Sequence, residues 1–242
     1  MGESGDGFLV STADGKHMLV DGGRRNSGIV ASLRNAKVQR LDVVVATNPD
    51  ADHIGGLIEV LKTIPVTEVW LSGDINTTIT FEDFIDAVSA SGATVKAVRR
   101  GDALTLGTLP VTALHPIEPF ASDRNNNSVA LRVVVGHVSF LLGGDIEGAA
   151  EASMVASGME LRSTVLKLGH HGSRTSTSAK FLAAVQPEIA VYQAGTNNQY
   201  GHPHPGTLAA LAAAGVKVYG TAANGVVTIT TDGTTYQVKA ER

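Results

Sequence analysis

The sequence has no cysteine and few aromatic residues, and these shortages exclude several kinds of protein. Without cysteine, the chain of 242 residues holds no disulfide scaffold, no cysteine-ligated zinc site and no thiol nucleophile. Aromatic residues make up 5% of the chain and charged residues 17%, whereas hydrophobic residues make up 43%. That balance is typical of a folded globular protein with a sizeable core, and it excludes a disordered chain.

Long apolar runs and an excess of positive charge are also missing. The longest largely apolar stretches, residues 41–47 and 129–135, have the length of a strand, far short of the roughly 20 residues that span a bilayer. The formal net charge of −4 argues against a protein that binds nucleic acid through a global basic field, although a local basic groove stays open. Residues 1–7 lack a basic start followed by an apolar core, so we expect no signal peptide.

Hydrophobic periodicity predicts an α+β fold in which the second half of the chain repeats the order of the first. Hairpins over residues 8–20 and 129–142 each lead into a helix and then a strand. Residues 41–47 are almost continuously apolar, which is typical of a strand covered on both faces. We expect one domain over residues 1–242, with two packed sheets and helices outside. Helices are expected at residues 28–36, 54–63, 81–91, 148–156, 179–185 and 207–214.

The segment richest in possible chemistry lies directly after the apolar strand of residues 41–47. It offers Asp50, Asp52 and His53 within four residues and ends in two glycines. A tight strand-to-helix loop can turn two carboxylates and an imidazole toward one divalent cation, and glycines let the backbone pass close to it. The alternative is a helix cap, which needs only one of the aspartates.

Four further polar clusters also fall at the ends of expected strands. Asp145 follows two glycines, and it could equally cap the next helix. His170 and His171 are adjacent between glycines, an arrangement that packing seldom requires. Residues 200–205 carry two histidines beside prolines, and residues 125–128 are three asparagines and a serine. Taken alone, residues 200–205 could form a rigid surface turn, and residues 125–128 are typical of an ordinary turn.

In this order, the clusters resemble the metallo-β-lactamase superfamily, and within it the hydrolase domains of DNA-uptake proteins of the ComEC type and their free-standing relatives. The resemblance covers nearly the whole chain. Its motifs are residues 5–10, 19–23, 47–57, 68–73, 125–128, 144–145, 166–174 and 198–205. The resemblance implies a four-layer αββα sandwich of two mixed sheets, with helices outside and a metal site between the sheets.

The resemblance also implies a set of metal ligands. One ion would be held by Asp52, His53 and His170, with Asp145 bridging to a second ion. His171 is the second choice, since a rotation of its loop would exchange the two histidines.

The other ion would be offered Asn48, Asp50, Asp145 and Asn126. The family usually has histidine where this chain has Asn48, so this second set contains oxygen donors alone. Such a set suits manganese or magnesium better than zinc, whereas the set with two imidazoles accepts manganese or zinc. We expect one or two divalent ions per chain, Mn or Zn, one held well and one held weakly or with the help of substrate. The alternative is that Asn48 marks a site that has lost its activity.

The implied reaction is metal-assisted hydrolysis of a phosphodiester, with DNA as the expected substrate. Asp52 would handle the proton of the attacking water, and His171 belongs to the same catalytic set. His202 would contact the scissile phosphate or protonate the leaving oxygen. The substrate-binding residues would be Asn126, Ser128, Ser173, Tyr200 and His204.

Basic residues near the motifs supply the local charge that DNA binding needs. They are Arg24, Arg25, Arg34, Lys37, Arg40, Lys167, Arg174 and Lys180. A scattered solvated surface would have the same composition. Two other functions stay open: a phosphoesterase on another substrate such as phosphocholine esters, and a binding module without activity. The scarcity of aromatic residues disfavours the first, because a quaternary ammonium group binds best between aromatic rings.

Partners and location depend on whether the chain belongs to a larger protein. We expect DNA as a substrate, without a stable complex, and no membrane segment within these residues. As part of a ComEC-type membrane protein the chain would face the outside of the cell, and as a free-standing protein it would be soluble. The sequence does not determine an oligomeric state.

Overall fold

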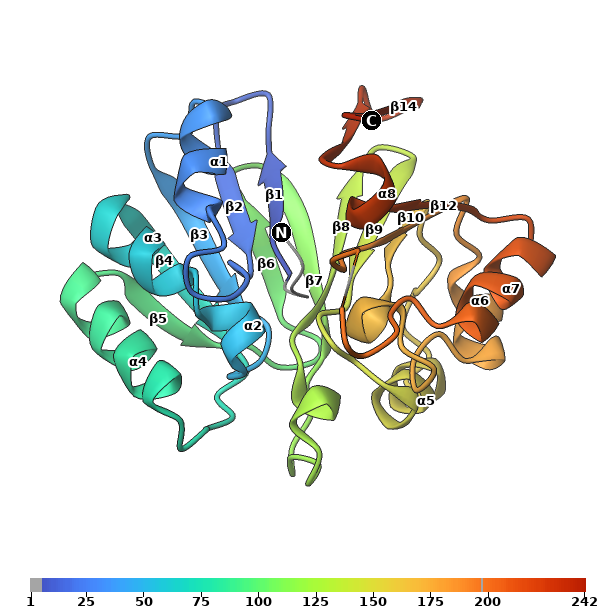
Figure 1. Ribbon diagram of the computed structural model, residues 1–242, viewed down its shortest axis with the longest axis horizontal. Helices are drawn as coiled ribbons and strands as arrows, with labels where there is room; N and C mark the ends of the chain where they lie inside the picture. The colour runs from blue at the N-terminus through green and yellow to red at the C-terminus, as the bar shows by residue number, and fades with distance from the viewer. Residues whose placement is uncertain (1–5, 197) are drawn as a thin grey trace.

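Two β-sheets packed face to face form the centre of the computed structural model, which describes residues 6–196 and 198–242 (Figure 1). Gly5, where the first sequence motif begins, lies outside the described residues. In the first sheet, the strands follow the order β1 (Phe8–Ser11), β2 (His17–Val20), β3 (Leu41–Ala46), β4 (Val66–Leu71) and β5 (Thr94–Ala97). In the second sheet, the order is β12 (Lys217–Gly220), β11 (Ile189–Tyr192), β10 (Val165–Lys167), β9 (Val138–Leu142), β8 (Ala130–Val135), β7 (Leu109–His115) and β6 (Ala103–Leu106).

Both sheets are mixed, as the sequence predicts. In the first, β1 pairs antiparallel with β2, and β2 to β5 run parallel. In the second, β9 to β12 run parallel, whereas β6 to β9 are joined antiparallel. Because β2 and β3 are parallel neighbours, and so are β9, β10 and β11, the carboxyl ends of each set lie along one edge of its sheet.

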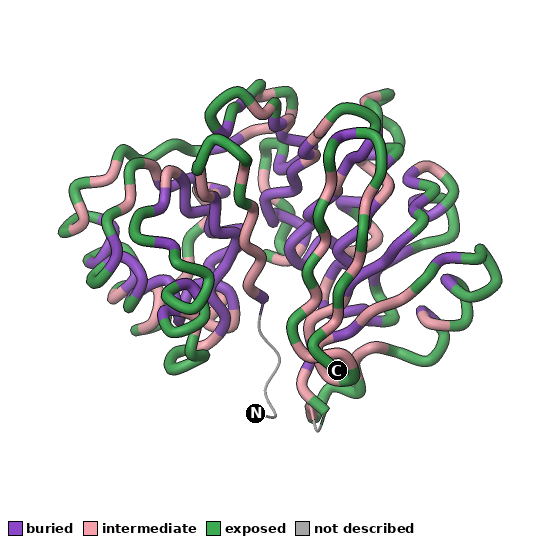
Figure 2. The backbone as a smooth tube through the Cα atoms, turned by 90° about the horizontal axis from the view of Figure 1, so that it is seen from above, coloured by how far each residue is buried: buried purple, intermediate pink, exposed green. Residues whose placement is uncertain are grey.

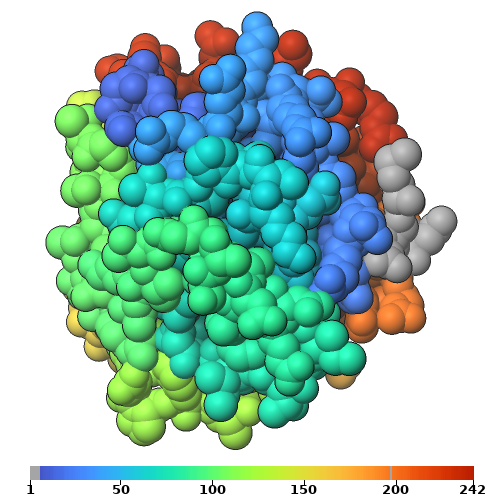
Figure 3. Space-filling view, turned by 90° about the vertical axis from the view of Figure 1, so that its left-hand side faces the viewer, coloured from blue at the N-terminus to red at the C-terminus, as the bar shows by residue number. Residues whose placement is uncertain are grey.

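Helices cover the outer faces of the two sheets. The α-helices are α1 (Ile29–Asn35), α2 (Ala51–Ile54), α3 (Leu57–Thr63), α4 (Ile79–Ser91), α5 (Gly148–Ala156), α6 (Ala179–Val185), α7 (Pro205–Ala213) and α8 (Thr221–Asn224). Two short 3-10 helices are η1 (Arg124–Asn127) and η2 (Gly169–Gly172). Figure 1 shows α1 to α4 on the side of the first sheet and α5 to α7 on the side of the second, and Figure 3 shows the first of these helical layers face on.

The burial pattern of β3 illustrates why four layers form. Val43 and Val45 face the second sheet and pack against its strands, while Val44 and Ala46 face the outer helices. A strand covered on both faces has no polar side, which explains the continuous apolar run at residues 41–47. In Figure 2 the buried backbone follows the middle of both sheets. The predicted αββα sandwich is therefore confirmed.

The helix after β3 differs from the prediction. The expected single helix over residues 54–63 is wrong: α2 begins at Ala51, and Gly55 and Gly56 separate it from α3. The break arises because α2 packs tightly against the turn after β2. A Cβ atom on Gly56 would lie only 2.0 Å from the carbonyl oxygen of Gly22. This close approach fixes α2 beside the end of β2 and so positions Asp52 and His53, which lie within α2.

A separate hairpin, β13 (Val227–Thr231) with β14 (Tyr236–Ala240), follows the second sheet. Its side chains Ile229, Tyr236 and Val238 pack against Val165 and Ile189 of the second sheet. Throughout the described part of the chain, every helix is too short or too polar to cross a membrane.

Candidate metal centre

The candidate residues meet where strands of both sheets end. Asp21 follows β2, Asp52 and His53 follow β3, and Asp145 follows β9. His171 follows β10 in the same way. Ligands of sheets with parallel strands bind beyond the carboxyl ends of those strands, so the topology itself gathers these side chains at one place.

His53 is the most deeply buried member of the centre, and two carboxylates hold its ring. Its Nδ1 lies 2.8 Å from Oδ2 of Asp21, and its Nε2 lies 3.0 Å from Oδ2 of Asp145. Asp21 is itself fixed by Thr47, whose backbone N–H and hydroxyl donate to it at 2.8 and 2.7 Å. Burial opposes a charge on His53, but Asp145 and Asp21 outweigh it and raise the pKa of His53 well above its usual value.

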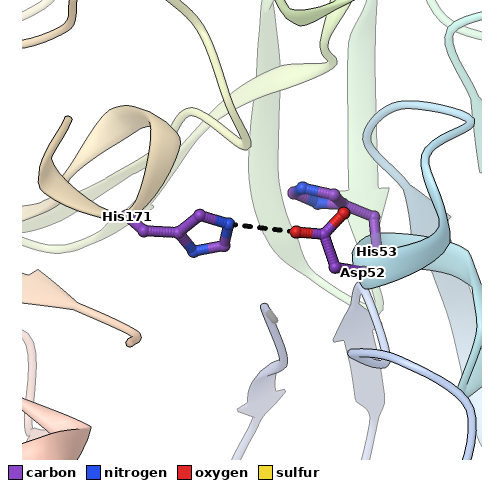
Figure 4. A group of neighbouring side chains, drawn as sticks. All are labelled: Asp52, His53 and His171. Atoms are coloured by element: carbon purple, nitrogen blue, oxygen red, sulfur yellow. Dashed lines mark ion pairs between the residues drawn. The ribbon is translucent and has the colours of Figure 1, made fainter. Parts of the chain in front are cut away.

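His171 approaches the same point from the second sheet. It and His170 adopt left-handed backbone angles, with φ of 55° and 44°, which residues other than glycine seldom do. Nε2 of His171 forms an ion pair with Asp52 at 3.4 Å, as Figure 4 shows. The same nitrogen lies 3.6 Å from Asp145. Burial opposes its charge, but Asp145 and Asp6 raise the pKa of His171 to about 10.

The two aspartates facing these imidazoles are ionised. Burial disfavours the charge on each, but the pKa of Asp52 is lowered to about 2 by His171 and His53. His53 and His171 likewise hold the pKa of Asp145 well below its usual value. The centre therefore combines two carboxylates with two imidazoles, and the negative charge of the carboxylates raises the pKa of both imidazoles.

These residues fit a divalent cation. Ligand atoms of Asp52, His53 and His171 lie within 4.8 Å of one another, and Asp145 faces both imidazoles. Among the described residues, Nε2 of His53 and Nε2 of His171 are buried and make no hydrogen bond of suitable geometry, although carboxylate oxygens lie 3.0 to 3.6 Å from them. An orphaned buried nitrogen is unfavourable unless something coordinates it. Two nitrogens with two carboxylates are a donor set for manganese or zinc.

His170, the first-choice ligand in the sequence analysis, lies at the rim of the centre. Its Nδ1 pairs with Oε1 of Glu147 at 2.6 Å, and its Nε2 is 4.0 Å from Asp145. The side chain is 27% exposed, compared with 2% for His171. The geometry therefore favours His171 over His170 as the partner of Asp52 and His53, because the left-handed turn of η2 directs His171 inward.

Asn48 and Asp50, expected near a second ion, direct their oxygens elsewhere. Oδ1 of Asn48 accepts from the backbone N–H of Asp50 at 2.9 Å, and its amide donates to Ser128 at 3.3 Å. Oδ1 of Asp50 accepts from Asn76 at 2.9 Å and from Arg124 at 3.3 Å. These atoms are thus committed to hydrogen bonds that hold the loop after β3.

Three of the expected substrate-binding residues, Asn126, Ser128 and Ser173, make hydrogen bonds within the protein. Oδ1 of Asn126 accepts from the backbone N–H of Ala150 in α5, so it supports that helix. The Ser128 hydroxyl accepts from the backbone N–H of Asp145 at 3.3 Å and thus holds the β9 end. The Ser173 hydroxyl pairs with Thr175 at 2.8 Å. All three are bonded within the protein scaffold that surrounds the centre.

The loop after β11 brings His202 to the mouth of the centre. Its ring centroid lies 5.2 Å from that of His170 and 6.1 Å from that of His171. Burial, together with His170 and His171, lowers the pKa of His202 to about 4. Tyr200, which is 55% exposed, stacks on His202 at 5.9 Å, whereas His204 accepts from the backbone N–H of Gly206 and caps α7.

Three acidic residues of the centre, Asp6, Asp21 and Glu147, are missing from the residues that the sequence predicts, and Lys167 is predicted in another role. Asp6 and Asp21 each stand beside glycine in motifs of the resemblance, which was the available signal. Lys167 was grouped with surface cations for DNA, and this assignment is wrong because its side chain is 4% exposed. The available signal was its place within an otherwise apolar strand, residues 165–168.

Comparisons with known proteins agree with this geometry. The family model described as the metallo-beta-lactamase superfamily matches residues 2–195. ComE operon protein 3 of Bacillus subtilis is 33% identical over 82% of this chain and 26% of its own length. Competence protein ComA of Neisseria gonorrhoeae is 36% identical over 93% of this chain and 31% of its own length. The chain thus spans about a quarter to a third of these relatives.

A solved structure shows the same fold at low sequence identity. The metallo-beta-lactamase fold protein YhfI from Bacillus subtilis superposes with a TM-score of 0.58 at 16% identity, covering 90% of this chain and 93% of that one. The match of the family model, the identity to the two competence-related proteins and the donor set between two sheets lead to one conclusion. The chain belongs to the metallo-β-lactamase superfamily of metal-binding hydrolases.

Proposed function

We propose that the chain is a metal-dependent phosphodiesterase that cleaves DNA. The observation that carries the proposal is the convergence of Asp52, His53, Asp145 and His171 on one point between the sheets. A divalent ion bound there would activate a water molecule and stabilise the charge that develops on the phosphoryl oxygens.

Asp52 is suited to orient the attacking water. Its side chain is 21% exposed, whereas His171 beside it is 2% exposed, so Asp52 faces the opening of the centre. With its pKa lowered to about 2, the carboxylate is ionised at neutral pH and accepts hydrogen bonds. A positioned acceptor of this kind holds the water in line with the phosphorus atom.

His202 is suited to hold the other side of the phosphate. Burial, His170 and His171 lower its pKa to about 4, so the ring is neutral at pH 7 and has one N–H. A neutral imidazole at the mouth of the centre can donate that N–H to a phosphoryl oxygen or to the leaving oxygen.

DNA is proposed as the substrate because of local charge and of the relatives. Arg174 after η2 is exposed and follows His170 by four residues. Arg124 in η1 is also exposed, and the amide of the next residue, Asn125, lies 3.5 Å from His170. Exposed arginines near a phosphate-binding centre supply the sequence-independent part of DNA affinity. One relative is named a competence protein, a word that refers to the uptake of DNA.

The alternatives have less support. A site that lost its activity with Asn48 is disfavoured, because the four converging donors do not include Asn48. A phosphocholine pocket would need aromatic walls, and the Tyr200 ring stacks on His202 instead of facing an open cavity.

The test is DNA cleavage by the metal-loaded protein. We expect single- or double-stranded DNA to be cleaved with Mn²⁺, and Asp52→Asn to lower the rate by about 100-fold or more, because it removes the charge that orients the water. Asp86→Asn is the matched control, since Asp86 is exposed on α4, and it should keep the wild-type rate.

Two outcomes would contradict the proposal. One is a metal-loaded wild-type protein that leaves both forms of DNA intact over hours. The other is hydrolysis of a chromogenic phosphocholine ester without any cleavage of DNA, which would move the assignment to the other phosphoesterase class.

A further inference from the structure

A second group of possible ligands lies directly beside the first. Its members are Asp6, His53 and Asp145, whose ligand atoms also lie within 4.8 Å of one another. The two groups share His53, and Asp145 of the second group also lies 3.6 Å from His171 of the first, so together they resemble a two-ion centre. The question is whether both groups can bind a cation at once.

His53 can serve one of the two groups only. Its Nδ1 is paired with Asp21 at 2.8 Å, which leaves Nε2 as the single free ring nitrogen. A neutral imidazole nitrogen has one lone pair and binds one ion. If Nε2 serves the group with Asp52 and His171, a second ion would keep only Asp6 and Asp145 from the chain.

Those two carboxylates already face a cation of the protein itself. The Lys167 ammonium group forms an ion pair with Oδ2 of Asp6, donates to the carbonyl oxygen of Gly144 at 2.7 Å and lies 3.7 Å from Oδ1 of Asp145. Three oxygen atoms, from Asp6, Gly144 and Asp145, therefore surround the ammonium group.

The backbone keeps Lys167 in this position. Strand β10 pairs with β9 on one side and with β11 on the other, so Lys167 sits in the middle of the second sheet. Asp6 is fixed as well: the backbone of Gly7 is held by both polar atoms of the Gln193 side chain, at 3.4 and 2.5 Å. A divalent ion between Asp6 and Asp145 would have to displace a buried ammonium group or bear its repulsion.

We propose that Lys167 is a fixed internal cation that replaces a second metal ion, so that the chain without substrate binds one divalent ion, at Asp52, His53, Asp145 and His171. The inference rests on the metal centre of the proposed function. It also explains the two sides of Asp145: Oδ1 faces Lys167, while Oδ2 faces both imidazoles.

The experiment counts metal ions per chain. Wild-type protein is stripped with a chelator, loaded with Mn²⁺, freed of excess metal and measured by elemental analysis, with calorimetric titration as a second readout. We expect one ion for the wild type and two for Lys167→Met, because the uncompensated Asp6 carboxylate then becomes available. The melting temperature of Lys167→Met should also rise more steeply with Mn²⁺ than that of the wild type.

Two further variants separate this role from general damage. Asp6→Asn combined with Lys167→Met removes both charges of the pair and should return the count to one ion. Lys16→Met breaks a surface ion pair with Asp42. Lys16 lies at the opposite end of β2 from Asp21, and this variant should also bind one ion.

The outcomes distinguish this inference from the proposed function. Two ions in the wild type, or one ion in folded Lys167→Met at saturating Mn²⁺, would overturn the inference and leave the metal centre in place. Failure of Lys167→Met to fold even in Mn²⁺ would also overturn it, since a divalent ion should replace the lost charge. No bound ion in the wild type would instead contradict the proposed metal centre itself.

Discussion

At the scale of single residues, the centre depends on carboxylates that orient imidazoles. Two histidines have their Nδ1 hydrogen-bonded to a carboxylate oxygen: His53 with Asp21 at 2.8 Å and His170 with Glu147 at 2.6 Å. Nδ1 of His171 instead donates to the carbonyl oxygen of Gln193 at 2.9 Å, with Oδ1 of Asp6 3.1 Å away. Such pairs fix the ring and leave Nε2 to face a ligand. None of these carboxylates was selected from the sequence, because the pairing joins residues far apart in the chain.

The pair of Asp21 with His53 leads to a test of metal affinity. We expect Asp21→Asn to weaken metal binding by about 10- to 100-fold, because the amide no longer holds the ring of His53 or increases its basicity. The measurement is competition for Mn²⁺ or Zn²⁺ with a chelator of known affinity.

The matched control for Asp21→Asn is Asp42→Asn. Asp42 belongs to β3, the strand next to Asp21, but it pairs with Lys16 at 3.0 Å near the surface. Its replacement should leave metal affinity unchanged. Equal affinities of Asp21→Asn and the wild type would show that Asp21 does not position a metal ligand.

At the scale of elements, helix α5 anchors the loop that carries the histidines. Glu147, just before α5, contacts His170 and accepts from the Thr175 hydroxyl at 2.7 Å. Glu151, within α5, accepts from the backbone N–H groups of Thr177 and Ser178 at the start of α6. One turn of helix thus holds both ends of the segment between β10 and α6.

Removal of the Glu151 carboxylate should therefore destabilise the fold. We expect Glu151→Ala to lower the free energy of unfolding by about 2–3 kcal/mol, since the buried N–H of Thr177 and the partly buried N–H of Ser178 lose their acceptor. Urea denaturation at neutral pH measures the change. Glu59→Ala, on the exposed side of α3, is the control and should change stability by less than about 0.5 kcal/mol. A similar loss in both variants would contradict the anchoring role.

The sequence predicts the elements better than it predicts the side chains between them. The apolar run of residues 41–47 and the helix at residues 148–156 depend on local periodicity, so both were placed nearly as they are found. The inward position of His171 instead depends on two successive left-handed residues in η2, which no hydrophobic pattern encodes. Likewise, the apolar neighbours of Lys167 indicate a buried strand, but its partner Asp6 is 161 residues away in the sequence, so no local pattern predicts the ion pair.

At the scale of the whole molecule, the connection between the two sheets contains a buried neutral histidine. His115 ends β7, which follows the last strand of the first sheet by way of β6. Its Nε2 donates to the carbonyl oxygen of Asn126 at 2.7 Å, and Arg100 donates to its Nδ1 at 3.3 Å. Protonation would place a second N–H against the Arg100 guanidinium, so this arrangement requires the neutral ring.

The neutral state of His115 makes the stability of the whole fold depend on pH. Burial, with a smaller contribution from Arg100, lowers its pKa to about 4 from the usual 6.5. The unfolded chain thus takes up a proton first as pH falls, and this contribution to stability is present above pH 6.5 and is lost as pH falls toward 4. Linkage gives a loss of about 2 kcal/mol in the free energy of unfolding between pH 7.5 and pH 5.

Urea denaturation at several pH values measures this loss. We expect the loss of unfolding free energy between pH 7.5 and pH 5 to be about 2 kcal/mol smaller in His115→Gln than in the wild type. The control is His137→Gln, which changes an exposed histidine and should keep the wild-type pH dependence. If His115→Gln retains the full dependence, the acid sensitivity of the fold arises from other groups, and the neutral ring between Arg100 and Asn126 does not contribute to it.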